Sequence, residues 1–388
     1  MIRRASVLIV GAGVIGASVA YHLAKRGVRR VVVFDRGAGP GNGSTSRATG
    51  GFRAQFATRV NVWLSLLARE KLLAFRDETG VDPGYAQAGY LWIASTESSM
   101  ASLRQALAVQ QSAGLAEAEE IDAETVAELN PAVPRDGIVG ATWCPRDGFI
   151  KPMEILRGYL TAAERLGATI EWGVDVNEIL VDKQGRASEA NTFAGPITFD
   201  AIVNAAGPWA GELKCGGHSA LPVVPLKRQV ALSVPTGILP ETMPMTIFVE
   251  SALHLRVRDG RVMIIKPTPV HDSNPFDTTV DDRLIESVSA EAAMRVPSLA
   301  NLEIDRAACY AGLYEMSPDN HAILGAAPWC ENLFLANGSS GHGVMHSPAL
   351  GQLLSEIICD GVASSLDVSA LRPTRFSERA LNPPLEML

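Results

Sequence analysis

The stretch ASVLIVGAGVIG, residues 5–16, decides the fold of this chain. Its first six residues form an apolar, β-branched run that is typical of a buried parallel strand. The glycines that follow have the spacing G-x-G-x-x-G. In this pattern the first glycine permits a tight turn, the second admits a pyrophosphate, and the third lets a helix pack closely on the strand. The residues predicted to hold the phosphates are Gly11, Gly13, Val14, Ile15 and Gly16.

The residues after this turn complete a strand–helix–strand unit. Residues 17–26 predict a helix that Gly27 ends, and residues 31–34 predict a second buried strand. Asp35 stands at the end of that strand, where a carboxylate accepts hydrogen bonds from the adenosine ribose hydroxyls. Arg36 follows, but Asp35 argues against the extra phosphate of NADP. The order of these parts predicts a dinucleotide-binding unit.

The identity of the dinucleotide is open at this point. The chain has no second G-x-G-x-x-G after a strand. A single dinucleotide site in a chain of this length fits a tightly held FAD with its own substrate domain. It also fits an NAD-dependent dehydrogenase, so the first forty residues do not decide between the two cofactors.

The composition is that of an ordinary globular protein. The 388 residues are 47% hydrophobic, and the length suggests about two domains. Lys and Arg number 34 against 42 Asp and Glu, a net charge of −8 without a long basic run, so we expect no nucleic-acid partner. No apolar run reaches the roughly 18 residues of a membrane span. We therefore expect a cytoplasmic protein without an integral membrane segment.

The cysteines and hydrolase motifs narrow the chemistry further. The cysteines are scattered and lack zinc spacing, so we expect reduced, mostly buried thiols and no metal site. Neither a G-x-S-x-G elbow nor an H-E-x-x-H motif indicates a hydrolase. The five cysteines are Cys144, Cys215, Cys309, Cys330 and Cys359.

Four further segments carry a resemblance to a known family. They are residues 41–53, 202–210, 312–319 and 337–345, with the sequences GNGSTSRATGGFR, IVNAAGPWA, GLYEMSPD and NGSSGHGVM. Together with the N-terminal unit, they resemble the FAD-dependent D-amino-acid oxidase-like family. The chain is most similar to the branch of sarcosine oxidase, glycine oxidase and the β-subunit of dye-linked L-proline dehydrogenase. Residues 143–148 and 371–376 resemble the last of these.

The resemblance implies an α/β fold in two interleaved parts. One is a discontinuous Rossmann-like FAD-binding domain, expected at residues 1–80, 145–215 and 305–388. The other is a substrate domain built on an antiparallel sheet, expected at residues 81–144 and 216–304.

The sequence pattern is compatible with this fold. It predicts amphipathic helices over residues 59–79 and 152–166, strands between residues 227 and 266, and a helix over residues 281–295.

The resemblance also implies a reaction. It is the transfer of a hydride from the carbon beside an amine nitrogen to flavin N5, which gives an imine. Main-chain N–H groups at the start of the last helix would stabilise the negative charge of the reduced ring. The further residues implied to bind FAD are Gly43, Ser44, Thr45, Ser46, Val176, Ala206, Gly207, Gly338, Gly341, His342, Gly343 and Met345.

Departures from the family pattern bear on how FAD is held. Gly312 stands where monomeric sarcosine oxidase has the cysteine that binds its flavin covalently, and Cys309 is three residues out of register. We therefore expect non-covalent FAD and an ordinary buried thiol at Cys309.

Other positions bear on the substrate. Arg53 matches the arginine that binds the substrate carboxylate in sarcosine oxidase. Tyr314 stands where glycine oxidase and the D-amino-acid enzymes have arginine, which favours secondary amine acids such as sarcosine or L-proline. Met345 stands where sarcosine oxidase has a lysine that makes a second contact with the substrate carboxylate. Arg53 is therefore the one carboxylate contact that the resemblance leaves. His254 and Lys266 are further catalytic candidates, although our alignment places Lys266 one residue away from the family's lysine, which reverses its face on a strand.

Several alternatives stay open. The chain could be the FAD-bearing subunit of a multi-subunit amino-acid dehydrogenase, or a D-amino-acid dehydrogenase. Outside this class, an NAD-dependent dehydrogenase or a non-catalytic flavoprotein scaffold would fit. The expected partners are a small amine or amino-acid substrate and an electron acceptor, which is oxygen, a quinone or another subunit.

Overall fold

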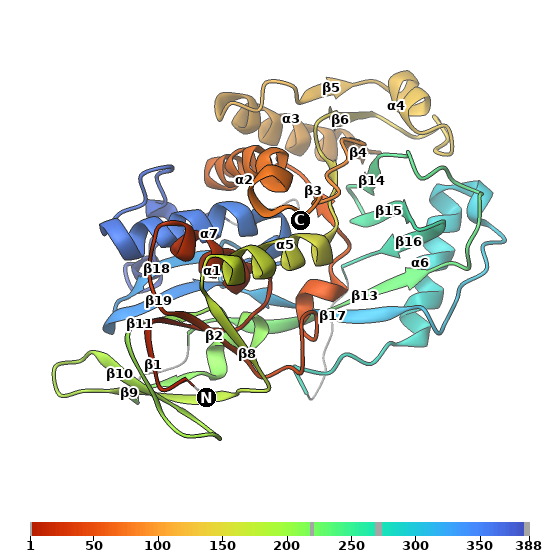
Figure 1. The fold of residues 1–388 in the computed structure, drawn as a ribbon. Helices are drawn as coiled ribbons and strands as arrows, with labels where there is room; N and C mark the ends of the chain where they lie inside the picture. Colours follow the sequence, from red (N-terminus) through yellow and green to blue (C-terminus); the bar gives the residue numbers. More distant parts are fainter. Residues whose placement is uncertain (1, 218–220, 268–273, 384–388) are drawn as a thin grey trace.

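The computed structural model describes residues 2–217, 221–267 and 274–383 of the chain (Figure 1). Within these ranges, two large sheets dominate, one of nine strands and one of eight. No helix in the same ranges is both long and apolar enough to cross a membrane.

The first sheet has a parallel centre that begins with the strand predicted over residues 5–10. Ile9 lies opposite Val33 on one side and Val203 on the other. Across the sheet, the parallel strands are β8 (Thr169–Trp172), β2 (Val31–Asp35), β1 (Arg4–Val10), β11 (Ile197–Asn204) and β19 (Cys330–Asn337). Its flanking strands are β18 (Ile323–Ala327), β10 (Ala187–Thr192), β9 (Val176–Val181) and β12 (Lys214–Cys215).

Helices cover one face of this sheet (Figure 1). They are α1 (Val14–Lys25), α2 (Arg59–Thr79), α5 (Pro152–Arg165) and α7 (Gly343–Asp360). α1 packs on both α5 and α7, and α2 packs on α7. The α1–α7 approach depends on Gly351, where an added Cβ would lie 2.1 Å from Ser18 Oγ. This packing buries the apolar side chains of α1 almost completely.

The second sheet is largely antiparallel and carries α6 (Asp282–Arg295) against one face (Figure 1). α3 (Glu97–Ser112) and α4 (Ala123–Leu129) lie beside its far strands. In order across the sheet, its strands are β17 (Tyr310–Met316), β13 (Val224–Leu232), β16 (Arg261–Ile265), β15 (Leu253–Arg258), β14 (Met245–Phe248), β4 (Tyr90–Ala94), β6 (Gly140–Cys144) and β5 (Glu119–Ile121).

The remaining elements are short. β3 (Gly51–Phe52) pairs with β7 (Gly148–Phe149). The 3-10 turns are η1 (Ser44–Arg47), η2 (Gly207–Glu212), η3 (Pro297–Leu299), η4 (Ser369–Leu371) and η5 (Pro373–Phe376).

A buried ion pair fixes the C-terminal segment to the rest of the molecule. The side chains of Arg375 and Asp319 are 0% and 1% exposed, with Nε–Oδ2 and Nη2–Oδ1 distances of 2.8 and 2.9 Å. Asn382 Nδ2 donates to the same carboxylate at 3.0 Å. Burial disfavours the charge of Asp319, but Arg375 holds the pKa of this carboxylate well below its usual value.

The architecture confirms the predicted mixed α/β fold with a Rossmann-like unit, and it differs from the prediction in the start of one helix. α1 begins at Val14, three residues before the predicted start, because the last part of the glycine motif already forms its first turn. β17 pairs with β13 along its whole length and so belongs to the second sheet. The predicted domain boundaries, which place residues 305–388 in the FAD-binding domain, stay a prediction.

Candidate active site

A cavity of about 840 Å³ lies between the two sheets. It extends from the glycine turn after β1, past the end of β11 and the start of α7, to the faces of β13, β15 and β17. Parallel strands β1, β2 and β11 end at this edge of the first sheet, which is where α/β sheets bind ligands. The cavity therefore joins a nucleotide-type cradle to a second chamber.

The three glycines of the fingerprint all lie at or just after the turn between β1 and α1. Gly11 has a φ of +105°, and an added Cβ would lie 2.4 Å from the carbonyl oxygen of Ala205. A Cβ on Gly16 would lie 1.9 Å from the carbonyl oxygen of Gly11, so this glycine permits close packing and does not itself line the cavity. Gly13 opens to the cavity, and the atom nearest to an added Cβ there is Thr45 Oγ1, at 3.6 Å. This cradle fits a dinucleotide pyrophosphate.

Asp35 also lies at the cavity wall, as predicted. Its Oδ2 accepts the Ala12 N–H at 2.8 Å, and its Oδ1 accepts the Gly37 N–H at 2.7 Å. Arg36 lines the cavity too, and its guanidinium carbon lies 4.1 Å from the centre of the Trp209 ring. Two backbone N–H groups, one from the glycine turn and one from the residues after β2, thus fix the Asp35 carboxylate.

The turn η1 fits between the glycine cradle and β17. Thr45 Oγ1 accepts the Val14 N–H at 3.2 Å, which ties the turn to the first residue of α1. Ser44 Oγ donates to the carbonyl oxygen of Leu313 at 2.7 Å. Ser46 is exposed, bonds to the carbonyl oxygen of Gly41 and does not line the cavity. Its role is therefore in holding the turn.

Most of the other predicted FAD residues come together at the cavity wall. Gly338 does not, because an added Cβ would lie 2.9 Å from Ser317 Cβ, which indicates a packing role. Those that do line the cavity are Val14, Ile15, Gly43, Val176, Ala206, Gly207, Gly341, His342, Gly343 and Met345.

Arg53 is a buried cation at the wall of the second chamber. It is 3% exposed, donates through Nη1 to the Gln55 carbonyl oxygen at 2.9 Å, and lies 4.1 Å over the Phe56 ring. Burial lowers the pKa of its guanidinium to about 10, so it stays protonated at neutral pH. Arg53 forms no ion pair with any residue that the structure describes. A carboxylate in the chamber would supply its missing counter-charge.

The contact between Arg53 and His342 indicates which nitrogen of this histidine carries no proton. Arg53 Nη2 lies 3.3 Å from His342 Nε2, and since a guanidinium only donates, that nitrogen is the acceptor. Burial, with further effects from Arg53 and His346, holds the pKa of His342 well below its usual value. His342 is therefore a neutral imidazole at the start of α7.

His254 and Tyr314 face the same chamber as neutral polar groups. Burial, followed by the charges of Arg53 and Arg228, lowers the pKa of His254 to about 3. Its Nε2 is buried and has no hydrogen-bond partner among the described residues. Burial raises the pKa of Tyr314, whose ring packs on Gly341, where an added Cβ would lie 2.4 Å from Tyr314 Cε2. Both side chains can exchange hydrogen bonds with a ligand without changing charge.

Lys266 does not lie where a catalytic role requires. Its Nζ forms an ion pair with Glu291 Oε2 of α6 at 2.5 Å, while Ile265 and Pro267 on either side line the cavity. The reason is strand alternation, since neighbouring residues point to opposite faces. Cys309 also faces away, with its Sγ 3.3 Å from the carbonyl oxygen of Asp305. None of the five cysteines, all within the described ranges, lines the cavity.

The structure adds wall residues that sequence reasoning missed. Arg228 and Val230 of β13 both line the cavity, as do Met245 and Ile247 of β14. Their i, i+2 spacing on each strand is a signal that alternation could have supplied. Tyr90 of β4 joins them, and only the pairing of β4 with β14 brings it there.

This combination defines a class of protein. A dinucleotide cradle leads into a chamber that contains a buried arginine, neutral polar groups and an apolar wall, as in a dinucleotide-dependent oxidoreductase that acts on a small anionic substrate. The family described as FAD dependent oxidoreductase (DAO) matches residues 6–357. The chain belongs to this DAO family.

Individual relatives agree with the family. Glycine oxidase of Geobacillus kaustophilus is 28% identical over 366 residues, which cover 92% of this chain and 94% of that protein. Mitochondrial dimethylglycine dehydrogenase of Rattus norvegicus is 28% identical over 402 residues, covering 97% of this chain and 45% of that longer protein. The crystal structure of L-proline dehydrogenase from P. horikoshii is similar with a TM-score of 0.90 and 26% identity, covering 98% and 100% of the two chains.

The family answers the cofactor question that the first forty residues left open. The chain is an FAD-dependent oxidoreductase, and its homologues include enzymes that act on C–N bonds. The alternative of an NAD-dependent dehydrogenase is wrong. The cradle and cavity described above fit FAD. Which individual residues contact it stays a prediction.

Proposed function

We propose that this chain oxidises the C–N bond of a secondary amine that bears a carboxylate, such as sarcosine, L-proline or another N-substituted amino acid. The observation that carries the proposal is the Arg53 guanidinium, which is 3% exposed, lines the cavity and forms no ion pair with a described residue. The names of the similar L-proline and dimethylglycine dehydrogenases support the same substrate class.

FAD, when bound, supplies the hydride acceptor for the carbon beside the nitrogen. The chain supplies the binding and the electrostatics. The main-chain N–H groups at the start of α7, beside His342 and Gly343, place positive partial charge at the cavity wall. Such a helix start stabilises negative charge as an oxyanion hole does.

In this proposal the substrate is held by one charge and several neutral contacts. Arg53 binds the carboxylate and so orients the neighbouring carbon. Tyr314 and His254 offer hydrogen bonds to the amine without adding charge. The side chains of Val230, Met245, Ile247 and Ile265 form an apolar wall that excludes water. A positive and dry chamber also favours the neutral amine, which is the form that can be oxidised.

A second candidate is a dehydrogenase that passes electrons to a quinone or a partner subunit instead of oxygen. The ion pair of Lys266 with Glu291 favours it, because the lysine that assists oxygen reduction in sarcosine oxidase has no counterpart among the described residues of this wall. Tyr314 in place of arginine argues against a D-amino-acid dehydrogenase. Non-covalent binding of FAD and a cytoplasmic location stay predictions.

The test is an anaerobic titration of the purified holoenzyme with sarcosine, L-proline, glycine, D-alanine and N-methyl amino acids. The expected result is bleaching of the visible flavin band by a secondary amine acid. Arg53→Met should raise the half-saturating concentration at least about 30-fold, since a charge-assisted hydrogen bond contributes about 2–3 kcal/mol.

Lys266→Met is the matched control, because it removes a cation whose ion pair lies outside the cavity. It should leave the titration unchanged. FAD content, measured in the supernatant after acid precipitation, should be the same in all three proteins, which also tests non-covalent binding. If the wild type and Arg53→Met had the same half-saturating substrate concentration, the proposed role of Arg53 would be wrong.

A further inference from the structure

A second buried acid, Asp147, lies directly behind the segment that carries Arg53. Asp147 is 0% exposed and follows β6 in the loop that leads to β7. Its Oδ1 accepts the Ala54 N–H at 2.9 Å. Its Oδ2 lies 3.4 Å from both the backbone nitrogen and the side-chain Nε2 of Gln55. The carboxylate therefore fixes the two residues that follow Arg53.

The same segment fixes the guanidinium. The carbonyl oxygen of Gln55, whose N–H faces Asp147, accepts Arg53 Nη1 at 2.9 Å. Gln55 Nε2 also donates to the carbonyl oxygen of Tyr90 at 3.1 Å, which ties the segment to β4. Asp147 makes no direct ion pair with Arg53, but its charge raises the pKa of Arg53 against the larger effect of burial. The charge of Asp147 therefore acts on Arg53 through the protein interior.

Few other charges surround Asp147. Burial raises its pKa to about 7, against the hydrogen bonds from Ala54 and Gln55 and the positive charge of Arg69. Arg69, from α2, is itself paired with Glu117. The remaining titratable groups that face Asp147 are uncharged near neutral pH and come from the neighbouring loop and strands: Tyr85, Tyr90 and Cys144. The adjacent Arg146 is largely exposed and lies 3.9 Å from Glu117.

We propose that Asp147 couples carboxylate binding at Arg53 to the uptake of one proton. An ionised Asp147 weakens the positive potential that Arg53 presents to the cavity, whereas a protonated Asp147 does not. A carboxylate that enters beside Arg53 adds a negative charge to the same buried region, and Asp147 then takes a proton from solvent. The inference rests on the proposed function, because it takes Arg53 as the carboxylate site.

The sign of the pH dependence follows from linkage. Since the carboxylate binds better to the protonated form, binding raises the pKa of Asp147 above its free value of about 7. Below this value Asp147 is protonated with or without ligand, and the affinity is constant. Above it the affinity falls until the pH passes the raised pKa of Asp147 in the complex, because binding in this interval takes up a proton.

The experiment measures acetate binding to the FAD-loaded enzyme by flavin absorbance and by calorimetry between pH 6 and 9. Acetate is fully ionised in this range and cannot be oxidised at a C–N bond. The expected wild-type Kd is flat near pH 6 and rises about tenfold towards pH 9, as one coupled proton allows at most tenfold per pH unit. Calorimetry in buffers of different ionisation enthalpy should show net proton uptake at pH 8.

Asp147→Asn should bind acetate with a Kd that does not change with pH and that matches the wild-type value at pH 6. The matched control is Glu315→Gln. Glu315 is also buried, lines the same cavity and has a pKa that burial raises to about 7, but its Oε1 accepts the Ser339 N–H, and among these described residues no hydrogen bond joins it to Ala54 or Gln55. The control should keep the wild-type pH dependence.

The outcomes separate the two proposals. Acetate that binds Arg53→Met as well as the wild type contradicts the proposed function. Binding that needs Arg53 but shows neither pH dependence nor proton uptake overturns only the coupling. A pH dependence that persists in Asp147→Asn overturns it as well. If Asp147→Asn does not accumulate as a holoenzyme, the wild-type proton count decides alone.

Discussion

At the scale of single residues, the chamber contains imidazoles that do not titrate near neutral pH. His254 is the clearest example, because burial and two arginines together bring its pKa to about 3. A histidine in this state exchanges hydrogen bonds but is not charged between pH 5 and 9. It can therefore position an amine, whereas a proton-accepting role would require a much higher pKa.

The prediction for His254→Gln follows from this state. The level of kcat/KM should fall about tenfold, the usual effect of losing one hydrogen bond to a neutral partner. The shape of its pH profile between pH 5 and 9 should stay that of the wild type. The measurement is steady-state kinetics with an artificial dye as electron acceptor. If the wild-type profile showed an inflection near pH 6.5 that the variant profile lacks, His254 would titrate in this range and the prediction would be wrong.

The residue scale also shows what the sequence could and could not predict. Arg53 was predicted from its place in a motif, and the structure puts it at the cavity wall. For Lys266 the sequence alignment already indicated an offset of one residue from the family's lysine, and the structure pairs its Nζ with Glu291 outside the cavity. Asp147 received no role, because its partners Ala54 and Gln55 are more than ninety positions away. Contacts of that range leave no local pattern in one sequence.

At the scale of elements, the β1–α1 unit is the part that sequence predicts best. Its strand, turn and helix follow from neighbouring residues alone, and the structure differs only in where α1 begins. β17 was harder, because its membership of the second sheet depends on pairing with β13, some eighty positions earlier. Local periodicity indicates that a strand exists, but it does not name its partner.

Two alanine variants in the β1–α1 turn should separate folding from cofactor binding. Gly13 has a φ of −67°, which any residue adopts, and its nearest neighbour atom lies 3.6 Å from an added Cβ. Gly13→Ala should therefore fold normally but bind FAD at least about tenfold more weakly, because the methyl group occupies the approach to the pyrophosphate. Apoprotein titration with FAD, alongside circular dichroism, measures both properties.

Gly16→Ala is the counterpart. Its Cβ would lie 1.9 Å from the Gly11 carbonyl oxygen, so α1 cannot pack on β1 without moving. This variant should lose folding and FAD together. If Gly13→Ala bound FAD as tightly as the wild type, the backbone at Gly13 would not be the phosphate contact.

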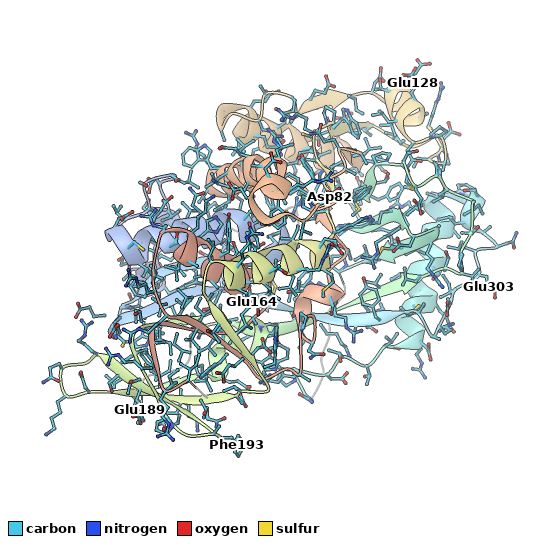
Figure 2. The ribbon with its side chains drawn as sticks, viewed as in Figure 1. Asp82, Glu128, Glu164, Glu189, Phe193 and Glu303 are labelled. Carbon is cyan, nitrogen blue, oxygen red and sulfur yellow. The ribbon has the colours of Figure 1, made fainter. Side chains whose placement is uncertain are left out.

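At the scale of the whole molecule, the net charge and the charges of the cavity differ. The chain is acidic, with a net charge of −8, and exposed carboxylates such as those of Asp82, Glu128 and Glu303 are spread over its outside (Figure 2). Four arginines line the cavity, Arg36, Arg47, Arg53 and Arg228, together with the acids Asp35, Asp175, Glu212 and Glu315. The attraction for an anionic substrate is therefore local to arginines such as Arg53, since the cavity wall as a whole carries both signs of charge.

The buried ion pair near the C-terminus should control global stability without touching the reaction. Arg375→Met leaves Asp319 buried without its cation, which should lower the free energy of unfolding by about 3–5 kcal/mol. The matched control, Arg372→Met, breaks an exposed pair with Glu378 in the same segment and should cost less than about 1 kcal/mol. Denaturant unfolding of the holoenzymes at neutral pH measures both, and acetate affinity should not change. Similar losses in the two variants would contradict the stabilising role of Arg375.

β17 has a consequence for engineering by recombination. The strand hydrogen-bonds to β13 along the second sheet, carries Tyr314 at the cavity, and contacts the turn before α7 through Met316 and Ser339. A chimaera that grafts the second sheet of a homologue onto this scaffold cannot place its crossover between β16 and β17. The donor would have to contribute β17 together with its junction to α7, so the two halves of this enzyme are not interchangeable modules.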